Sequence, residues 1–214
     1  MRTLTQSSLD ATFFPLTPGQ LSQLNGICRL ARWLDGKDAI PAGSSNMSLR
    51  VNHHSFLISK SGFHKRSLQP HHFVRCDLES KPLHPVAPKP SDETQLHAMV
   101  YRHDPHAQVI IHCHFPSFDK AKVWDLELTD HELLKALGCA THDTKCQISV
   151  YPNSQNMTQL SQEISEDFFL GKNPTEFHCN FAFFLENHGI YIWGKNLTEV
   201  QNRLEAVMYF LGNL

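Results

Sequence analysis

The stretch QVIIHCHFPS, residues 108–117, places two histidines at the end of an apolar run. In an extended strand, successive side chains alternate between the two faces of the sheet. His112 and His114 therefore point to one side while Cys113 points to the other. The stretch predicts a buried strand whose two imidazoles can converge on one atom, as in a metal site, or simply face solvent at a strand end.

Helical and strand patterns alternate along the rest of the chain. Thr17, Pro18 and Gln20 have the types and spacing of a capped helix start, and apolar residues follow at helical spacing until about Asp35. A second helix is expected to begin at Ser91, and others over 128–138, 157–171 and 197–213. Strands are expected over 46–51, 55–60, 72–79, 108–114 and 147–152, and on both sides of a turn at 187–189. This order predicts an α/β fold in which helices cover a sheet that begins as an antiparallel meander.

Composition limits the class of protein. The chain has 214 residues, 41% of them hydrophobic, which is enough for one core, so we expect a single domain over 1–214. Lys and Arg number 19 against 21 Asp and Glu, and the basic residues are scattered, so a nucleic-acid surface is not expected. The start of the chain lacks an apolar signal region and no stretch is long and apolar enough to span a bilayer, which predicts a cytoplasmic protein with a small ligand.

The cysteines follow no metal-binding or disulfide spacing. Without a CxxC pair or a signal peptide, we expect reduced thiols that are mostly buried. They are found at positions 28, 76, 113, 139, 146 and 179.

A third histidine could join this pair to form a three-ligand metal site. His188 lies in the segment ENHGIYIWG, where Gly189 permits a tight bend between two apolar strands. A single histidine in a turn is usually solvated. Together with His112 and His114, however, it would give three nitrogen ligands and leave one position open, as a catalytic zinc requires.

Three segments resemble the successive motifs of the class II aldolase/adducin superfamily: KPSDETQLHAMVY, VIIHCHFPS and ENHGIYIWG. Two more, LISKSGFHKRSLQPHHF and LTDHELLKALG followed by ATHD, are similar to a dehydratase branch of methionine salvage that removes water from a phosphorylated ketose. The resemblance implies a three-layer α/β/α fold with a central, mostly antiparallel sheet. It also implies a homotetramer with active sites near subunit boundaries, and one Zn²⁺ per subunit held by His112, His114 and His188.

Two carboxylates compete for the acid/base role that this resemblance implies. Glu132, in TDHELLK, matches an acid/base Glu of related dehydratases and is placed first. Glu93, in PSDET, occupies the position of the catalytic Glu of the aldolases. Both can act, because dehydration needs one proton removed and a hydroxyl helped to leave. The structural alternatives are that Ser91 caps a helix whose first turn contains Glu93, and that Thr129 and Glu132 form a capping box.

Short polar loops are expected to bind the substrate phosphate. Two features depart from the family pattern: a serine, not a glycine, precedes Asn46, and His72 stands where an acidic residue is more usual. Backbone N–H groups of such loops and of a helix start favour an anion. The expected phosphate-binding residues are Ser45, Asn46, Ser61, Gly62, Lys65 and Ser91.

Three other functions are compatible with parts of this pattern. A class II sugar-phosphate aldolase, of the fuculose or ribulose type, would use the same zinc and phosphate loops, but LTDHELLKALG and the single closing helix disfavour it. A non-catalytic adducin-like module would lack the ligand histidines. A structural zinc would favour a fourth protein ligand.

Overall fold

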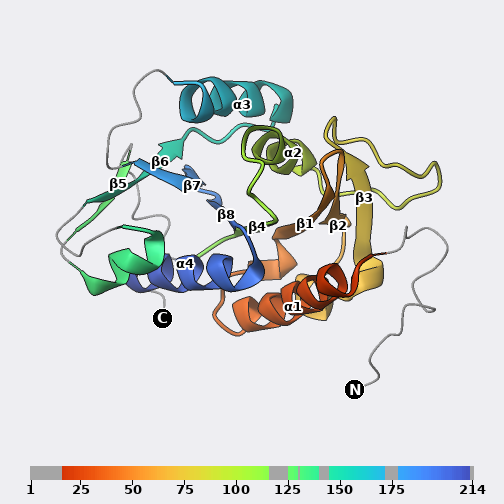
Figure 1. The fold of residues 1–214 in the computed structure, drawn as a ribbon, viewed down its shortest axis with the longest axis horizontal. Coiled ribbons are helices and arrows are strands. Elements are labelled where there is room, and N and C mark those ends of the chain that lie inside the picture. Colours follow the sequence, from red (N-terminus) through yellow and green to blue (C-terminus); the bar gives the residue numbers. More distant parts are fainter. Residues whose placement is uncertain (1–15, 116–124, 130, 140–144, 172–177, 213–214) are drawn as a thin grey trace.

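Eight strands form one sheet in the order β3-β2-β1-β4-β8-β7-β6-β5, seen in the computed structural model of Figure 1. The structure describes residues 16–115, 125–129, 131–139, 145–171 and 178–212. Every neighbouring pair is antiparallel except β6 and β7, which are parallel, so the sheet is mostly antiparallel as predicted. The strands are β1 (Asn46–Asn52), β2 (Ser55–Ser59), β3 (Phe73–Asp77), β4 (Val109–Cys113), β5 (Asp125–Leu128), β6 (Cys146–Tyr151), β7 (His178–Leu185) and β8 (Gly189–Gly194).

Helices cover both faces of the sheet. Figure 1 shows α1 (Pro18–Asp35) and α4 (Leu197–Phe210) below the sheet, and α2 (Thr94–His103) and α3 (Met157–Ile164) above it. The expected three-layer α/β/α architecture is therefore confirmed. No helix in the described part of the chain is both long and apolar enough to cross a bilayer. All six cysteines carry free thiols, and five of them are buried.

The first helix begins as its sequence predicts. Thr17 Oγ1 accepts from the backbone N–H of Gln20 at 3.2 Å, and Gln20 Oε1 accepts from the N–H of Thr17 at 3.0 Å. This capping box satisfies two N–H groups that the helix itself leaves free. On the inner side, Gly26 lets α1 approach α4, because a Cβ there would lie 2.3 Å from a methyl carbon of Leu197.

Three predicted helices differ in detail. The helix α2 begins at Thr94 and not at Ser91, because residues 91–94 form a turn in which the N–H of Thr94 donates to the carbonyl of Ser91 at 3.2 Å. The region 128–138 holds a 3₁₀-helix, η6 (Glu132–Leu137). The imidazole of His131 caps it by accepting from the N–H of Leu133, so the N-cap is His131, and the alternative of a capping box between Thr129 and Glu132 is wrong.

The helix predicted over 157–171 changes type along its length. After Ile164 it widens into a π-helical turn, η7 (Ser165–Phe169), in which the N–H of Leu170 donates to the carbonyl of Ser165 at 3.2 Å. The sequence pattern therefore predicted a helix here correctly, but it did not predict the change from α-helical to π-helical hydrogen bonding.

A polar seam joins β1 to α2 inside the protein. Along β1, polar residues occur at every second position and so face the same side, towards α2. Along α2 and its N-cap, polar residues occur at every fourth position and so also share one side. The seam consists of Asn46, Ser48 and Arg50 from β1 and of Glu93, His97 and Tyr101 from the helix.

Arg50 closes one end of this seam. Its guanidinium is 6% exposed and donates to the carbonyls of Ala107 at 2.7 Å, Tyr101 at 2.7 Å and Asp104 at 2.9 Å. Two of these carbonyls belong to the last turn of α2 and its C-cap, which the helix cannot satisfy by itself. Arg50 thus secures the C-terminal end of α2 to the sheet.

We expect Arg50→Ala to lower the free energy of unfolding by about 2 to 4 kcal/mol, because it leaves two buried carbonyls and one partly buried carbonyl without their donor. Chemical denaturation followed by circular dichroism measures this loss. The exposed Arg29 provides the control, since Arg29→Ala should change stability by less than about 0.5 kcal/mol. Equal effects of the two substitutions would contradict a structural role for Arg50.

Candidate metal centre

The three predicted ligands meet at one end of the sheet, where β1 begins, β4 ends and β8 begins. Across these strands Asn46 pairs with His112, and His112 pairs with Tyr191. Residues that are paired across neighbouring strands place their side chains on the same face. The side chains of Asn46, His112 and Tyr191 therefore point to one face of the sheet, towards the start of α2.

His112 and His114 lie on the same face, as strand alternation predicts. Their Nε2 atoms are 3.0 Å apart. The other ring nitrogen of each histidine, Nδ1, lies 2.9 Å from a backbone carbonyl, that of Ile190 for His112 and that of Ser44 for His114. Because a carbonyl can only accept, each Nδ1 carries the proton and each Nε2 presents a lone pair.

Burial keeps this pair neutral. It lowers the pKa of His112 to about 3, and it also lowers the pKa of His114. Two neutral imidazoles whose lone pairs face each other at 3.0 Å repel unless a cation lies between them. A backbone carbonyl that holds the second nitrogen is also the usual support of a metal-bound histidine. The geometry therefore fits a metal ion.

His188 completes the cluster from the turn between β7 and β8. Asn187 makes this turn possible by adopting a φ of 52°, which asparagine tolerates better than most residues. One nitrogen from each of His112, His114 and His188 lies within 4.8 Å of the other two. Among the described residues no other His, Cys, Asp or Glu side chains form such a group.

Gly189 leaves the space that these rings occupy. A Cβ at this position would lie 2.4 Å from the carbonyl oxygen of Cys113, 2.8 Å from His114 Cδ2 and 2.9 Å from His112 Cε1. Any side chain here would have to displace both the strand and the imidazoles. The glycine is thus required by the close packing of β8 against the end of β4.

Glu93 is the carboxylate that faces the cluster. Its Oε2 lies 3.3 Å from His112 Nε2, and its Oε1 lies 3.3 Å from His188 Nε2. Oε2 also accepts hydrogen bonds from Asn46 Nδ2, at 2.7 Å, and from the hydroxyl of Tyr191. Burial alone would raise the pKa of Glu93, but the hydrogen bonds donated by Tyr191 and Asn46 hold it below the usual range. The carboxylate is therefore ionised.

Glu132 lies in a different environment. Its side chain is 68% exposed on η6 and forms an ion pair with Lys135, with 2.6 Å between Oε1 and Nζ. The helix η6 packs against α4, where the ring of His131 contacts those of Tyr209 and Phe210. Of the two predicted acid/base residues, Glu93 is the one that contacts the histidines.

Most of the predicted phosphate-binding residues lie near this end of the sheet. Ser45 donates to the carbonyl of His112, and Asn46 contacts Glu93. Ser61 and Ser91 come from two loops that run side by side, joined by hydrogen bonds from Ser61 N–H to the carbonyl of Lys89 and from Ser91 N–H to that of Ser59. Gly62, which follows Ser61, adopts a positive φ of 67°.

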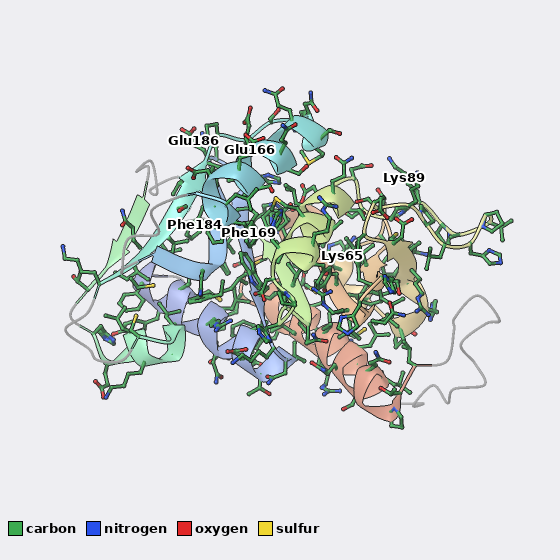
Figure 2. The ribbon with its side chains drawn as sticks, turned by 45° about the horizontal axis from the view of Figure 1, so that its top comes forward. Lys65, Lys89, Glu166, Phe169, Phe184 and Glu186 are labelled. Carbon is green, nitrogen blue, oxygen red and sulfur yellow. The ribbon has the colours of Figure 1, made fainter. Side chains whose placement is uncertain are left out.

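The ammonium group of Lys65 points into the protein. It is 5% exposed, and its Nζ donates to the carbonyls of Phe63 at 2.7 Å and Lys60 at 3.2 Å. Burial, with the nearby charge of Lys60, lowers its pKa. In Figure 2, Lys65 lies among the packed side chains whereas the exposed Lys89 projects from the rim. Lys65 thus organises the loop that carries Ser61 and Gly62.

Tyr191 and His97 contribute to the site but were not predicted from the sequence as site residues. The four-residue spacing of Glu93, His97 and Tyr101 was a usable signal, because it places three polar side chains along one side of the helix. Nothing comparable marks Tyr191, which is recognised only through its pairing with His112.

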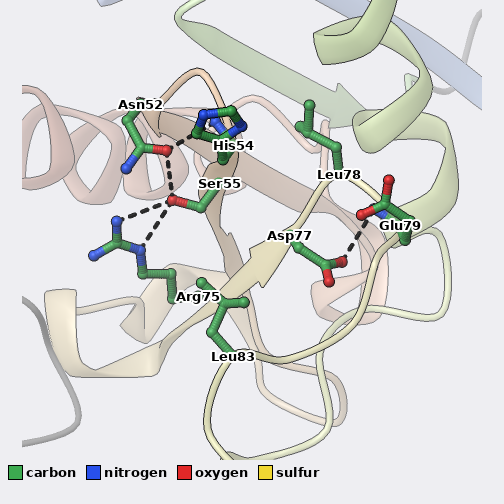
Figure 3. Close-up of a pocket in the computed structure, with 8 residues that line it drawn as sticks. All are labelled: Asn52, His54, Ser55, Arg75, Asp77, Leu78, Glu79 and Leu83. Carbon is green, nitrogen blue, oxygen red and sulfur yellow. Dashed lines mark hydrogen bonds between the residues drawn. The ribbon is translucent and has the colours of Figure 1, made fainter.

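A separate pocket lies at the opposite end of β1, where this strand pairs with β2. It has a volume of about 340 Å³, and its residues include Asn52, Ser55 and Asp77, at the far ends of β1, β2 and β3 (Figure 3). Arg75 donates to the hydroxyl of Ser55 there, at 3.0 and 3.1 Å. This pocket is therefore distinct from the histidine cluster.

Several known proteins and one family model are similar to this chain. The family model described as "Class II Aldolase and Adducin N-terminal domain" matches residues 25–212. A methylthioribulose-1-phosphate dehydratase from Methylococcus capsulatus is 34% identical over 83% of this chain and 85% of its own. A protein of the same name from Xylella fastidiosa strain 9a5c is 33% identical over 95% of this chain and 94% of its own.

Solved structures share the fold. That of L-fuculose-1-phosphate aldolase from Thermus thermophilus superposes with a TM-score of 0.66 at 21% identity, covering 89% of this chain and 93% of the other. With the family model spanning most of the residues and two curated relatives aligned over most of their length, the chain belongs to the class II aldolase/adducin family.

Proposed function

We propose that the protein is a zinc-dependent methylthioribulose-1-phosphate dehydratase of methionine salvage, acting in the cytoplasm as a single domain over 1–214. It would remove water from 5-methylthioribulose 1-phosphate to give 5-methylthio-2,3-dioxopentyl phosphate. The observation that carries this proposal is the cluster of three imidazoles beside one ionised carboxylate. The names of the relatives supply the substrate.

His112, His114 and His188 are the residues that would hold the zinc, since their nitrogens converge and two of them have carbonyl-bound second nitrogens. Bound there, zinc supplies a Lewis acid that polarises the ketone of the substrate. The loops that carry Ser45, Asn46, Ser61, Gly62 and Ser91 would bind the phosphate.

Two carboxylates divide the proton transfers in this proposal. Glu93 lies against the histidines and is ionised, so it can remove the proton from C3, next to the ketone. The C4 hydroxyl then needs a proton to leave as water. Glu132 is the candidate donor, and because it is exposed in one chain we propose that it serves a site near a subunit boundary of a homotetramer.

Incubation of zinc-loaded protein with 5-methylthioribulose 1-phosphate tests the function directly. Mass spectrometry should detect a product lighter by one water. Retro-aldol cleavage of L-fuculose 1-phosphate, without dehydration of the first substrate, would instead identify an aldolase.

The metal ligands can be tested without substrate. The double variant His112→Ala, His188→Ala should lose nearly all zinc, because one imidazole cannot hold the ion alone. Gly189→Ala should also lower the zinc content, since its methyl group displaces the rings. Elemental analysis of purified protein measures both. Full zinc retention in the double variant would exclude this site.

The two carboxylates can be compared as isosteric variants. Glu93→Gln and Glu132→Gln should each lower turnover about a hundredfold or more, because an amide can neither take up the C3 proton nor donate one to the C4 hydroxyl. Glu163→Gln, on the exposed side of α3, is the matched control and should leave turnover unchanged. Near-normal turnover of Glu132→Gln with a normal thermal midpoint would leave both proton transfers to Glu93.

Lys65 should affect substrate binding through its loop. Lys65→Ala removes the ammonium that ties together the carbonyls of Lys60 and Phe63, so the phosphate loop should loosen and KM should rise while zinc content stays constant. Steady-state kinetics and elemental analysis of one preparation provide both values. An unchanged KM would remove this loop from the substrate site.

A further inference from the structure

Behind Glu93 and Asn46, the polar seam continues as a chain of hydrogen bonds through His97, Ser48 and Tyr101, which have no part in the proposed reaction. Tyr101 OH lies 2.8 Å from Ser48 Oγ, and Ser48 Oγ lies 2.7 Å from His97 Nδ1. His97 Nε2 contacts Asn46 Oδ1, and Asn46 Nδ2 lies 2.7 Å from Glu93 Oε2. His97 and Ser48 are both completely buried.

The side-chain amide of Asn46 determines the direction of this chain, because its Nδ2 lies at Glu93 Oε2 and its Oδ1 lies at His97 Nε2. A carboxylate only accepts, so Asn46 must present its NH₂ group to Glu93 and its carbonyl to His97. His97 Nε2 then has to donate. Burial lowers the pKa of His97 to about 3, so the ring is neutral and carries only one proton. Nδ1 is therefore an acceptor, which makes the Ser48 hydroxyl the donor to it. Tyr101 then donates to Ser48 Oγ at 2.8 Å in preference to the carbonyl of Gln108 at 3.4 Å.

The side-chain amide of Asn46 has no intrinsic preference for either of its two flipped orientations. Its oxygen and nitrogen are nearly equal in size, and only hydrogen bonds distinguish the two orientations. A rotation of about 180° would place a carbonyl oxygen against the Glu93 carboxylate, where the two would repel. Because His97 offers a single N–H and no acceptor at Nε2, it permits one orientation only.

We infer that His97 is a positioning residue, which locks the amide of Asn46 so that Asn46 and Tyr191 both donate to Glu93 Oε2 and leave Oε1 as the atom that takes up the substrate proton. Oε1 is the oxygen that faces His188. An amide cannot pass a proton along, so the chain transmits orientation and not protons. The kinetic part of this inference rests on the proposed function, whereas the tautomer of His97 does not.

The tautomer is measured by NMR of protein labelled with ¹⁵N-histidine and loaded with zinc. The two-bond ¹H–¹⁵N spectrum should show His97 with a protonated Nε2 and a bare Nδ1, assigned by its disappearance in His97→Gln. Ser48→Ala removes the donor to Nδ1 and should introduce a second tautomer. An Nδ1–H tautomer in the unaltered protein would overturn the inference, whether or not the protein dehydrates its substrate.

A double-mutant cycle tests whether His97 acts through Asn46. His97→Leu should lower kcat about tenfold or more with little change in KM or zinc content, and His97→Gln, which keeps a donor near Nε2, should restore most of it. In an Asn46→Ala background, His97→Leu should have no further effect on kcat. Independent, multiplying effects of the two substitutions would contradict the inference.

His103 is the matched control for the cycle. It lies on the same helix, its Nε2 contacts Ser165 Oγ at 2.6 Å, and its ring stacks on Phe169. His103→Leu should leave kcat unchanged, so an equal loss in this variant would reduce the role of His97 to general support of α2. Absence of any dehydration in the unaltered protein would reject the proposed function alone, because the NMR result still decides the hydrogen-bond direction.

Discussion

Burial of polar groups between β1 and α2 is the constraint on which the site depends. A buried donor or acceptor that finds no partner costs about 1 to 3 kcal/mol, so the helix can pack here only where its polar groups match those of the strand. A strand repeats every two residues and a helix side about every four. Along this seam the two periods coincide, and Glu93 is therefore held beside Asn46 at the start of β1 and not one turn away.

Much of this arrangement follows from local pattern. Alternation along β4 suffices to place His112 beside His114, and capping chemistry suffices to start α1 at Pro18. What could not be predicted depends on partners distant in sequence. The turn at 91–94 is held to β2 by the bond from the N–H of Ser91 to the carbonyl of Ser59, and the environment of Glu132 is set by packing on α4.

Charge is distributed unevenly within the site. Desolvation favours the neutral form of His112, whereas the hydrogen-bond donors around Glu93 favour its ionised form, although both lie in the same buried region. Lys65, the nearby cation that the sequence analysis linked to phosphate, gives its hydrogen bonds to backbone carbonyls. The phosphate loops of the proposed site thus rely mainly on backbone N–H groups and hydroxyls.

The pairing of β4 with both β1 and β8 also orders the folding of the chain. The hairpins β1–β2 and β7–β8 are local and can close early, whereas β4 must find partners from opposite ends of the sequence. Contacts between residues so far apart in the sequence form slowly, because the chain loses the entropy of loop closure before the new contacts contribute any stability. The three imidazoles therefore converge only when the middle of the sheet is complete, and an ion that needs all three stabilises the finished fold without guiding the chain towards it.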